Sequence, residues 1–415
     1  MLKAINKAAL VLVFAAAFQS AAAQTGPPAS EAVRPFKIHI DDSVLAELKQ
    51  RLARTRFPSE ISGSSWDYGT SLTYLKDLVA YWLDKYDWRA AERRLNQFDQ
   101  FTTTIDGLDI HFIHQRSRNT SAMPLVISHG WPGSFLEFEK VVRPLTDPSD
   151  PADAFHVVIP SLPGYGFSDK PAAAGWGVER IARAWAELMD RLGYDRFGAQ
   201  GHDWGTSVST EIGKQSGDRV IGIHLVPPLV TPDPATFGDL TPAERAALSD
   251  LEPAGDPGDG YSLEHSTRPQ TIGYALVDSP AALCAWIIEK FQAWTDCDGD
   301  LESVLTRDEL LDNLMLYWLP GAGASSARLY WESFTEVRAR FHDANTDIVT
   351  VPAGCSVFPK ENPRPSRRWA SKRFTDIRYW GEPARGGHFA AFEQPDVFVN
   401  EVRACFRSFR RPAGG

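Results

Sequence analysis

The feature that most constrains the fold is a tight corner at residues 201–205, with the sequence Gly-His-Asp-Trp-Gly. A short apolar run, 197–199, precedes it, and a helix-compatible run, 206–214, follows it. Small residues on both sides let the backbone bend sharply between a strand and a helix and push the central side chain outward. The sequence therefore predicts a strand, a corner and a helix, with the side chain of Asp203 displayed at the corner.

The residue type at this corner restricts the chemistry. Esterases and lipases carry a serine here, and its hydroxyl must lose a proton before it attacks a carbonyl. An aspartate has an unperturbed pKa of about 3.9 and is already an anion at neutral pH. Asp203 can therefore displace a leaving group from saturated carbon without a base. The predicted substrate has a carbon–oxygen or carbon–halogen bond, and water must then cleave the ester formed on Asp203.

The order of the patterns predicts an α/β fold with a mostly parallel, doubly wound sheet. Strand-like and helical runs alternate between 101 and 228, and Asp106-Gly107 predicts a hairpin between 102–105 and 110–114. Apolar residues at helical spacing between 35 and 100 predict a helical N-terminal extension. After Pro227-Pro228 the pattern is mostly helical, and sheet-like runs return at 349–358, which is typical of a lid inserted after the sixth strand. The expected units are a signal peptide at 1–23, a flexible mature N-terminus at 24–34, the helical segment at 35–100, the core at 101–228 and 348–415, and the lid at 229–347.

The N-terminus has the pattern of a secretory signal peptide. Lys3 and Lys7 precede the apolar run Ala8 to Phe18, and small residues at 21–23 offer a cleavage site before Gln24. We expect an exported protein, periplasmic or secreted, with no membrane anchor after cleavage. The formal net charge of -10 argues against nucleic acid or an anionic membrane as a partner. The sequence gives no indication of the oligomeric state.

A second turn could stabilise negative charge beside Asp203. His129-Gly130-Trp131-Pro132 follows a short predicted strand. The backbone N–H groups of Trp131 and Trp204 could together face an oxyanion that forms when water attacks the ester carbonyl. The two indoles are also the expected substrate-binding side chains. We further predict a cis peptide bond between Trp131 and Pro132.

The remaining catalytic candidates lie late in the chain. His388, in a glycine-rich loop, is the predicted base that activates water. A base of this kind needs an acid to orient it, and Glu361 follows a predicted strand at the required end. Asp376 and Glu382 are the competing acids. His202 is next to the nucleophile and is expected to point away from the site.

If the carbon–oxygen bond belongs to a strained ring, its opening also needs a proton donor, because an alkoxide is a poor leaving group. Tyrosine hydroxyls on the lid suit this role. The pattern alone cannot choose among the four lid tyrosines, which are Tyr261, Tyr274, Tyr317 and Tyr330.

Metal and disulfide signals are weak. Asp296, Asp298 and Asp300 alternate as in a calcium loop, but Leu301 and Arg307 stand where glycine and glutamate are needed. We expect no metal and no other cofactor. An oxidising compartment permits a bridge between Cys284 and Cys297, which spacing cannot establish.

Taken together, these motifs resemble epoxide hydrolases of the microsomal and juvenile-hormone type, in the α/β-hydrolase superfamily. The resemblance covers nearly all of the mature chain, including 35–38, 66–69 and 101–107. It implies a substrate that is a small apolar epoxide, with water as co-substrate. It also implies roles for five residues, namely Asp203 as nucleophile, His388 as base, Glu361 as acid, and Tyr261 and Tyr330 as ring-activating tyrosines. The oxyanion turn of the family falls on His129-Gly130-Trp131-Pro132. Microsomal relatives carry a membrane anchor, which the predicted cleavable signal replaces here.

Two other functions remain open on the sequence. A haloalkane dehalogenase shares the aspartate, the following tryptophan and the histidine, and the two indoles leave it possible. The matched tyrosines and the N-terminal segment favour the epoxide. A non-catalytic binding protein of the same fold is the third reading, and the intact set of Asp203, Glu361 and His388 argues against it.

Overall fold

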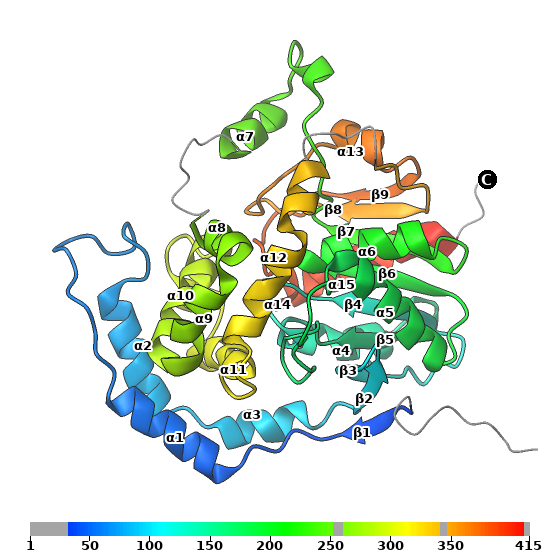
Figure 1. Ribbon diagram of the computed structural model, residues 1–415. Helices are drawn as coiled ribbons and strands as arrows, with labels where there is room; N and C mark the ends of the chain where they lie inside the picture. The colour runs from blue at the N-terminus through cyan, green and yellow to red at the C-terminus, as the bar shows by residue number, and fades with distance from the viewer. Residues whose placement is uncertain (1–31, 252–259, 341–346, 411–415) are drawn as a thin grey trace, which may run out of the picture.

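The computed structural model describes residues 32–251, 260–340 and 347–410 (Figure 1). The predicted signal peptide and most of the segment 24–34 lie outside these residues. Within the described part, nine strands form one sheet in the order β1-β2-β3-β5-β4-β6-β7-β8-β9. The strands are β1 (Arg34–Phe36), β2 (Gln100–Ile105), β3 (Leu108–Gln115), β4 (Met123–Ser128), β5 (Phe155–Pro160), β6 (Phe197–His202), β7 (Val220–Val226), β8 (Ala353–Ser356) and β9 (Ile377–Gly381).

The sheet is mostly parallel, as predicted. The neighbours from β5 through β4 and β6 to β9 all pair in parallel. The antiparallel pairs are β1–β2, β2–β3 and β3–β5. The predicted hairpin is β2–β3, where Ile105 pairs with Leu108. Asp106 and Gly107 have φ values of 49° and 82°, the positive angles that a two-residue hairpin turn of this type requires.

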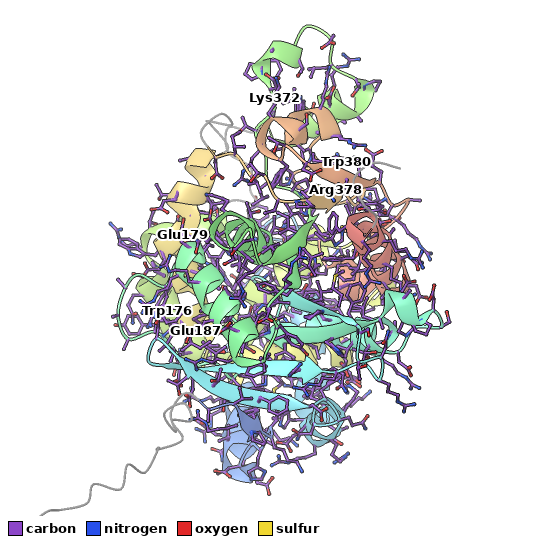
Figure 2. All side chains as sticks on the ribbon, turned by 90° about the vertical axis from the view of Figure 1, so that its right-hand side faces the viewer. Trp176, Glu179, Glu187, Lys372, Arg378 and Trp380 are labelled. Carbon is purple, nitrogen blue, oxygen red and sulfur yellow. The ribbon has the colours of Figure 1, made fainter. Side chains whose placement is uncertain are left out.

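Helices cover both faces of the sheet. α5 (Val178–Arg191) packs against α6 (Trp204–Gln215), and α4 (Glu139–Thr146) packs against α15 (Pro395–Arg410). A Cβ at Gly198 would meet Phe406 of α15, whereas one at Gly201 would meet the start of α6. Side chains three residues apart on a strand point to opposite faces, so α15 and α6 lie on opposite faces. In the side view, Arg378 and Trp380 mark the β9 edge, and Glu179 and Glu187 mark α5 (Figure 2).

The lid leaves the sheet after β7 and returns to it at β8. It contains α7 (Pro242–Leu251), α8 (Gly260–Thr267), α9 (Pro269–Asp278), α10 (Pro280–Trp294), α11 (Arg307–Trp318) and α12 (Gly323–Arg340). β7 is the sixth strand when the core is counted from β2. α12 contacts α8 and α9 on one side and α5 on the other, so it joins the lid to the core (Figure 1).

The N-terminal extension is helical apart from one strand that the pattern did not predict. β1 pairs with β2 at the edge of the sheet, and Phe36 packs on His111 and Phe167. The helices that follow are α1 (Asp42–Ala53), α2 (Leu72–Asp84) and α3 (Trp88–Leu95). They contact α10 and α11, so this segment runs along the lid (Figure 1).

Short segments complete the described chain. These are the 3₁₀ helices η1 (Phe135–Phe138), η2 (Pro151–Asp153), η3 (Pro234–Thr236) and η5 (Leu301–Ser303), and the helices α13 (Arg367–Arg373) and α14 (Ala390–Glu393). All four cysteines are buried and free, so Cys284 and Cys297 do not form a bridge. No helix in the described ranges is by itself long and apolar enough to cross a membrane, although α9 and α10, bent by 116°, meet the length and composition criteria as a pair.

Candidate active site

Asp203 lies at the corner between β6 and α6. Its backbone has a conformation that residues other than glycine rarely adopt. Its φ is 53° and its ψ is -125°. The corner closes only because its neighbours lack a side chain. A Cβ at Gly201 would lie 1.9 Å from the carbonyl oxygen of Gly205, and one at Gly205 would lie 1.9 Å from that of Ser128. Such strained backbone costs about 1–3 kcal/mol and is typical of functional sites.

Two backbone donors hold the Asp203 carboxylate. The N–H of Trp131 donates to Oδ1 at 2.8 Å, and the backbone of Trp204 also hydrogen-bonds to this carboxylate. A Cβ at Gly130 would lie 1.8 Å from Oδ1, which explains why glycine precedes Trp131. The Trp131–Pro132 bond is cis, as predicted. The two predicted oxyanion donors therefore converge on Asp203.

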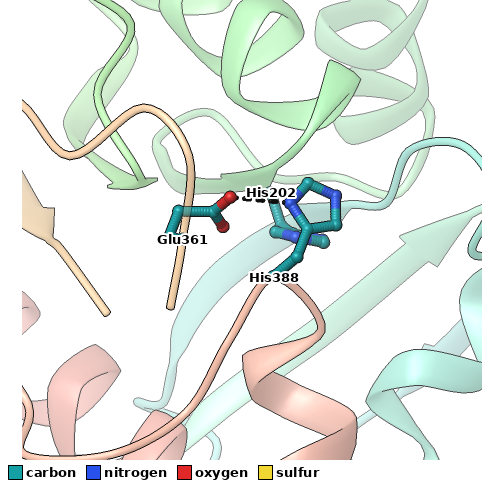
Figure 3. A group of neighbouring side chains, drawn as sticks. All are labelled: His202, Glu361 and His388. Carbon is teal, nitrogen blue, oxygen red and sulfur yellow. Dashed lines mark hydrogen bonds and ion pairs between the residues drawn. The ribbon is translucent and has the colours of Figure 1, made fainter. Parts of the chain in front are cut away.

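The other carboxylate oxygen faces His388. Nε2 of His388 lies 3.4 Å from Oδ2 of Asp203, and Nδ1 lies 2.8 Å from Oε1 of Glu361 (Figure 3 shows the second contact). Glu361 is almost fully buried. The competing acids are occupied elsewhere, since Asp376 pairs with Arg378 and Glu382 is exposed. Of the three candidate acids, the structure brings Glu361 to the histidine.

The loop that carries His388 is fastened to the end of α10. The N–H of His388 donates to the carbonyl oxygen of Trp294 at 2.8 Å. The buried carboxylate of Glu393 then accepts hydrogen bonds from three backbone N–H groups, those of Asp296 (2.7 Å), Phe389 (2.9 Å) and Gly387 (3.1 Å). Asp296, which resembled a calcium ligand in the sequence, also accepts from Gly386 at 2.9 Å. Lid and core together therefore position the histidine.

Charges within the site set the protonation states of Asp203 and His388. Burial works against the anion of Asp203, but the hydrogen bond and charge of His388 outweigh it and lower the Asp203 pKa. Burial also works against a charged His388, yet Glu361 and Asp203 raise the His388 pKa well above its usual value. The resting site therefore holds an aspartate anion next to an imidazolium.

Two of the four lid tyrosines lie beside Asp203. Tyr261 stacks on Trp131 with ring centroids 5.0 Å apart, and Tyr330 contacts Trp204 at 4.8 Å. The ring centroids of Tyr261 and Tyr330 are 5.7 Å apart, and the two side chains share a hydrogen bond. Burial, followed by the charges of Tyr261 and Asp203, raises the Tyr330 pKa well above 10, so its hydroxyl keeps its proton.

The other two tyrosines lie elsewhere. Tyr274 is 68% exposed on α9. Tyr317 donates its hydroxyl to the carbonyl oxygen of Gly133 at 2.5 Å, so it supports the oxyanion turn. The structure therefore distinguishes the two tyrosines beside Asp203 from the other two, which the sequence pattern could not do.

Two histidines near the site were not anticipated. His202 does not point away from the catalytic group, because its ring lies 4.4 Å from that of His388 (Figure 3). Its Nδ1 lies 3.0 Å from the buried carboxylate of Glu137. His265 of α8 contacts Trp131, Tyr261 and Tyr330. Its position four residues after Tyr261, on the same side of a helix, was the signal that could have revealed it.

One group of possible metal ligands occurs among the described residues. His202, Glu361 and His388 each offer an atom within 4.8 Å of the others (Figure 3). Glu361 and His388 already bond to each other, and His388 also faces Asp203, an arrangement that suits an acid–base relay. The three aspartates at 296–300 do not form such a group in the described part of the chain.

Comparisons with known proteins identify the family. The family model for the epoxide hydrolase N terminus matches residues 33–138, and that for the alpha/beta hydrolase fold matches residues 123–252. A homologue from Stigmatella aurantiaca is 50% identical over 382 residues, which are 91% of this chain and 86% of that one. Epoxide hydrolase 1 of Sus scrofa is 37% identical over 402 residues, covering 90% of this chain and 88% of the relative.

A solved structure extends the similarity to the whole fold. The crystal structure of juvenile hormone epoxide hydrolase from the silkworm Bombyx mori superposes with a TM-score of 0.84 at 32% identity, covering 92% of this chain and 95% of that chain. The match includes the N-terminal segment as well as the core, and it decides against a haloalkane dehalogenase or a binding protein without turnover. The chain therefore belongs to the epoxide hydrolases of the microsomal and juvenile-hormone type and is an epoxide-hydrolysing enzyme.

Proposed function

We propose that this hydrolysis gives a vicinal diol through a covalent alkyl ester on Asp203. The observation that carries the proposal is the unequal environment of the two carboxylate oxygens. Oδ1 accepts the N–H of Trp131 at 2.8 Å, whereas Oδ2 lies 3.4 Å from Nε2 of His388. Oδ2 is therefore the oxygen that attacks, and Oδ1 stays with the donors that stabilise charge later in the cycle.

In the first step, Oδ2 of Asp203 attacks one ring carbon and the bond from that carbon to the ring oxygen breaks. The oxygen takes a proton from Tyr261 or Tyr330, whose rings lie 5.7 Å apart beside Trp131 and Trp204. Burial raises the pKa of Tyr330, so its hydroxyl is protonated at neutral pH and can donate when the alkoxide forms. The aromatic surroundings suit a small apolar epoxide.

Alkylation itself prepares His388 for the second step. The ester is neutral, so His388 loses one of the two anions that raise its pKa, and it can pass its proton to the tyrosinate left by ring opening. Neutral His388, oriented by Glu361 at 2.8 Å, then takes a proton from water.

In the second step, the activated water attacks Cγ of Asp203. The negative charge develops on Oδ1, which already accepts the N–H of Trp131, and the backbone of Trp204 also hydrogen-bonds to this carboxylate. The bond from Cγ to the alkylated oxygen breaks, His388 returns its proton to the leaving alkoxide, and the diol forms. The acid left at Asp203, which now contains one oxygen from water, passes its remaining proton to His388, and this restores the carboxylate beside an imidazolium.

Oxygen labelling in a single turnover tests this route. Excess enzyme reacts with styrene oxide in heavy-oxygen water, and both the diol and the peptide that contains Asp203 are analysed by mass spectrometry. We expect the first diol to carry unlabelled oxygen from Asp203, and the label to appear in the Asp203 carboxylate. Under many turnovers the diol should become labelled, which is the internal control. Label in the diol of the first turnover, with none in Asp203, would show direct attack by water.

A further inference from the structure

His265 lies in the same aromatic group as the proposed proton donors. It is fully buried on α8, four residues after Tyr261. Its ring centroid is 4.7 Å from Trp131, 4.9 Å from Tyr330 and 5.8 Å from Tyr261. Two of these rings carry the hydroxyls assigned to ring opening, and the third belongs to the residue whose N–H holds Asp203. His265 therefore lies beside the groups that are proposed to act on the epoxide.

A hydrogen bond fixes the tautomer of this imidazole. Nε1 of Trp286 lies 2.9 Å from Nε2 of His265. An indole nitrogen can only donate, so Nε2 must accept. Burial, with a contribution from Lys290, lowers the His265 pKa to about 3, so the ring is neutral at physiological pH. A neutral imidazole with Nε2 as acceptor carries its single proton on Nδ1.

That proton has no acceptor in the described part of the chain. Nδ1 of His265 is buried, and the described residues provide no hydrogen-bond partner for it. The two nitrogens of an imidazole point in diverging directions, so the Nδ1–H is directed away from Trp286. A buried donor without an acceptor is unfavourable, and a bound ligand that supplies the acceptor removes that cost.

We propose that the Nδ1–H of His265 binds a hydrogen-bond acceptor that the substrate carries in addition to its oxirane oxygen. The preferred substrates are then apolar epoxides with an ether, ester or carbonyl oxygen close to the ring. This inference rests on the function proposed above, in which Tyr261 and Tyr330 serve the oxirane oxygen. A site built to hydrogen-bond a substrate group discriminates strongly against the analogue that lacks it.

Matched substrates test the proposal. Benzyl glycidyl ether and 1,2-epoxy-5-phenylpentane differ only by an oxygen in place of a methylene, and further pairs place an oxygen or a carbonyl at successive positions along the chain. The wild-type enzyme should prefer the oxygen-containing member of at least one pair by about tenfold in kcat/KM. His265→Phe should bring that ratio close to one, and His265→Gln, which keeps a donor, should retain part of it.

Leu263→Ala is the control, because Leu263 is 51% exposed on the same helix and should keep the wild-type ratio. Wild-type ratios near one across the whole series would overturn the proposal without reference to any variant. Equal ratios in the wild type and His265→Phe would also overturn it and would make His265 a packing residue against Trp131. Failure to form diol from any epoxide would instead refute the proposed function.

Nuclear magnetic resonance provides a second readout. In protein labelled with ¹⁵N-histidine, the His265 ring should show the proton on Nδ1, and this signal should shift when an amide inhibitor supplies an acceptor. A proton on Nε2 would overturn the proposal, because the free donor would not exist.

Discussion

In the proposed mechanism, the negative charge of Asp203 serves two purposes in succession. It acts as the nucleophile, and until it reacts it also keeps His388 protonated, because Glu361 and Asp203 together raise the His388 pKa despite burial. Formation of the ester removes one of these charges at the moment when a neutral base is needed. The two steps of the reaction should therefore depend differently on pH.

Rapid quenching between about pH 5 and 9 would separate these dependences. The lowered pKa of Asp203 keeps its carboxylate ionised over this range, so alkylation should stay nearly constant. Ester hydrolysis needs neutral His388, and Glu361 still raises the His388 pKa in the ester, so hydrolysis should slow as the pH falls. Hydrolysis that becomes faster toward acidic pH would contradict the role of His388 as base.

Both tyrosines beside Asp203, Tyr261 and Tyr330, should contribute to ring opening. Tyr261→Phe and Tyr330→Phe should each slow alkylation by about 10- to 100-fold and leave residual activity, since the second hydroxyl remains, and the double variant should lose nearly all activity. Stopped-flow measurement of alkylation gives these rates. Tyr274→Phe is the matched control, because Tyr274 is 68% exposed. Normal alkylation in both single variants would require another proton donor.

At the residue scale, the sequence predicted those site residues that lie in short, recognisable motifs. A motif of about five residues was enough to predict each of two site residues. These are Asp203, between small residues, and His388, in a glycine-rich loop, and the structure brings both together. Contacts between distant segments were not predictable in this way. The pattern left Tyr274 and Tyr330 equivalent, and it gave no sign that Trp286 fixes the tautomer of His265.

At the element scale, the loop of residues 386–389 is held by one buried carboxylate. Glu393 satisfies three backbone N–H groups from this loop and from the end of α10. Its removal would leave these donors without acceptors, and each unsatisfied buried donor costs about 1–3 kcal/mol.

Glu393→Ala should therefore lower the free energy of unfolding by at least about 2 kcal/mol and slow ester hydrolysis more than alkylation, because His388 is displaced. Glu393→Gln keeps an acceptor and should have a smaller effect. Urea denaturation and single-turnover kinetics measure the two changes, with Glu382→Ala at an exposed carboxylate as control. A stable Glu393→Ala variant with normal hydrolysis would show that the loop is held by other contacts.

The sequence patterns predicted helices and strands correctly where the apolar periodicity was long. They failed where a segment is a strand only because it pairs with a neighbouring strand. The hairpin β2–β3 followed from Asp106-Gly107 alone. β1 is three residues long and contains a proline, so nothing local marks it as a strand, and only its pairing with β2 makes it one. The lid boundaries were visible because the strand pattern stops at Pro227-Pro228.

At the scale of the whole molecule, we propose that the enzyme is exported. The basis is the sequence of residues 1–23, which lie outside the described residues. Expression of the full chain in a bacterial host should give a mature protein that begins at Gln24, as determined by intact mass and N-terminal sequencing of the extracytoplasmic fraction. Full-length protein confined to the cytoplasm would contradict this expectation.

The whole account requires that the carboxylate of Asp203 becomes bonded to substrate carbon. His388→Gln should permit alkylation and block hydrolysis, so incubation with styrene oxide should increase the intact mass of the protein by one substrate molecule. Peptide mapping should place the adduct on Asp203, and Asp203→Ala in the same background should not form it. An inactive His388→Gln enzyme that never acquires the adduct at Asp203 would contradict the covalent mechanism.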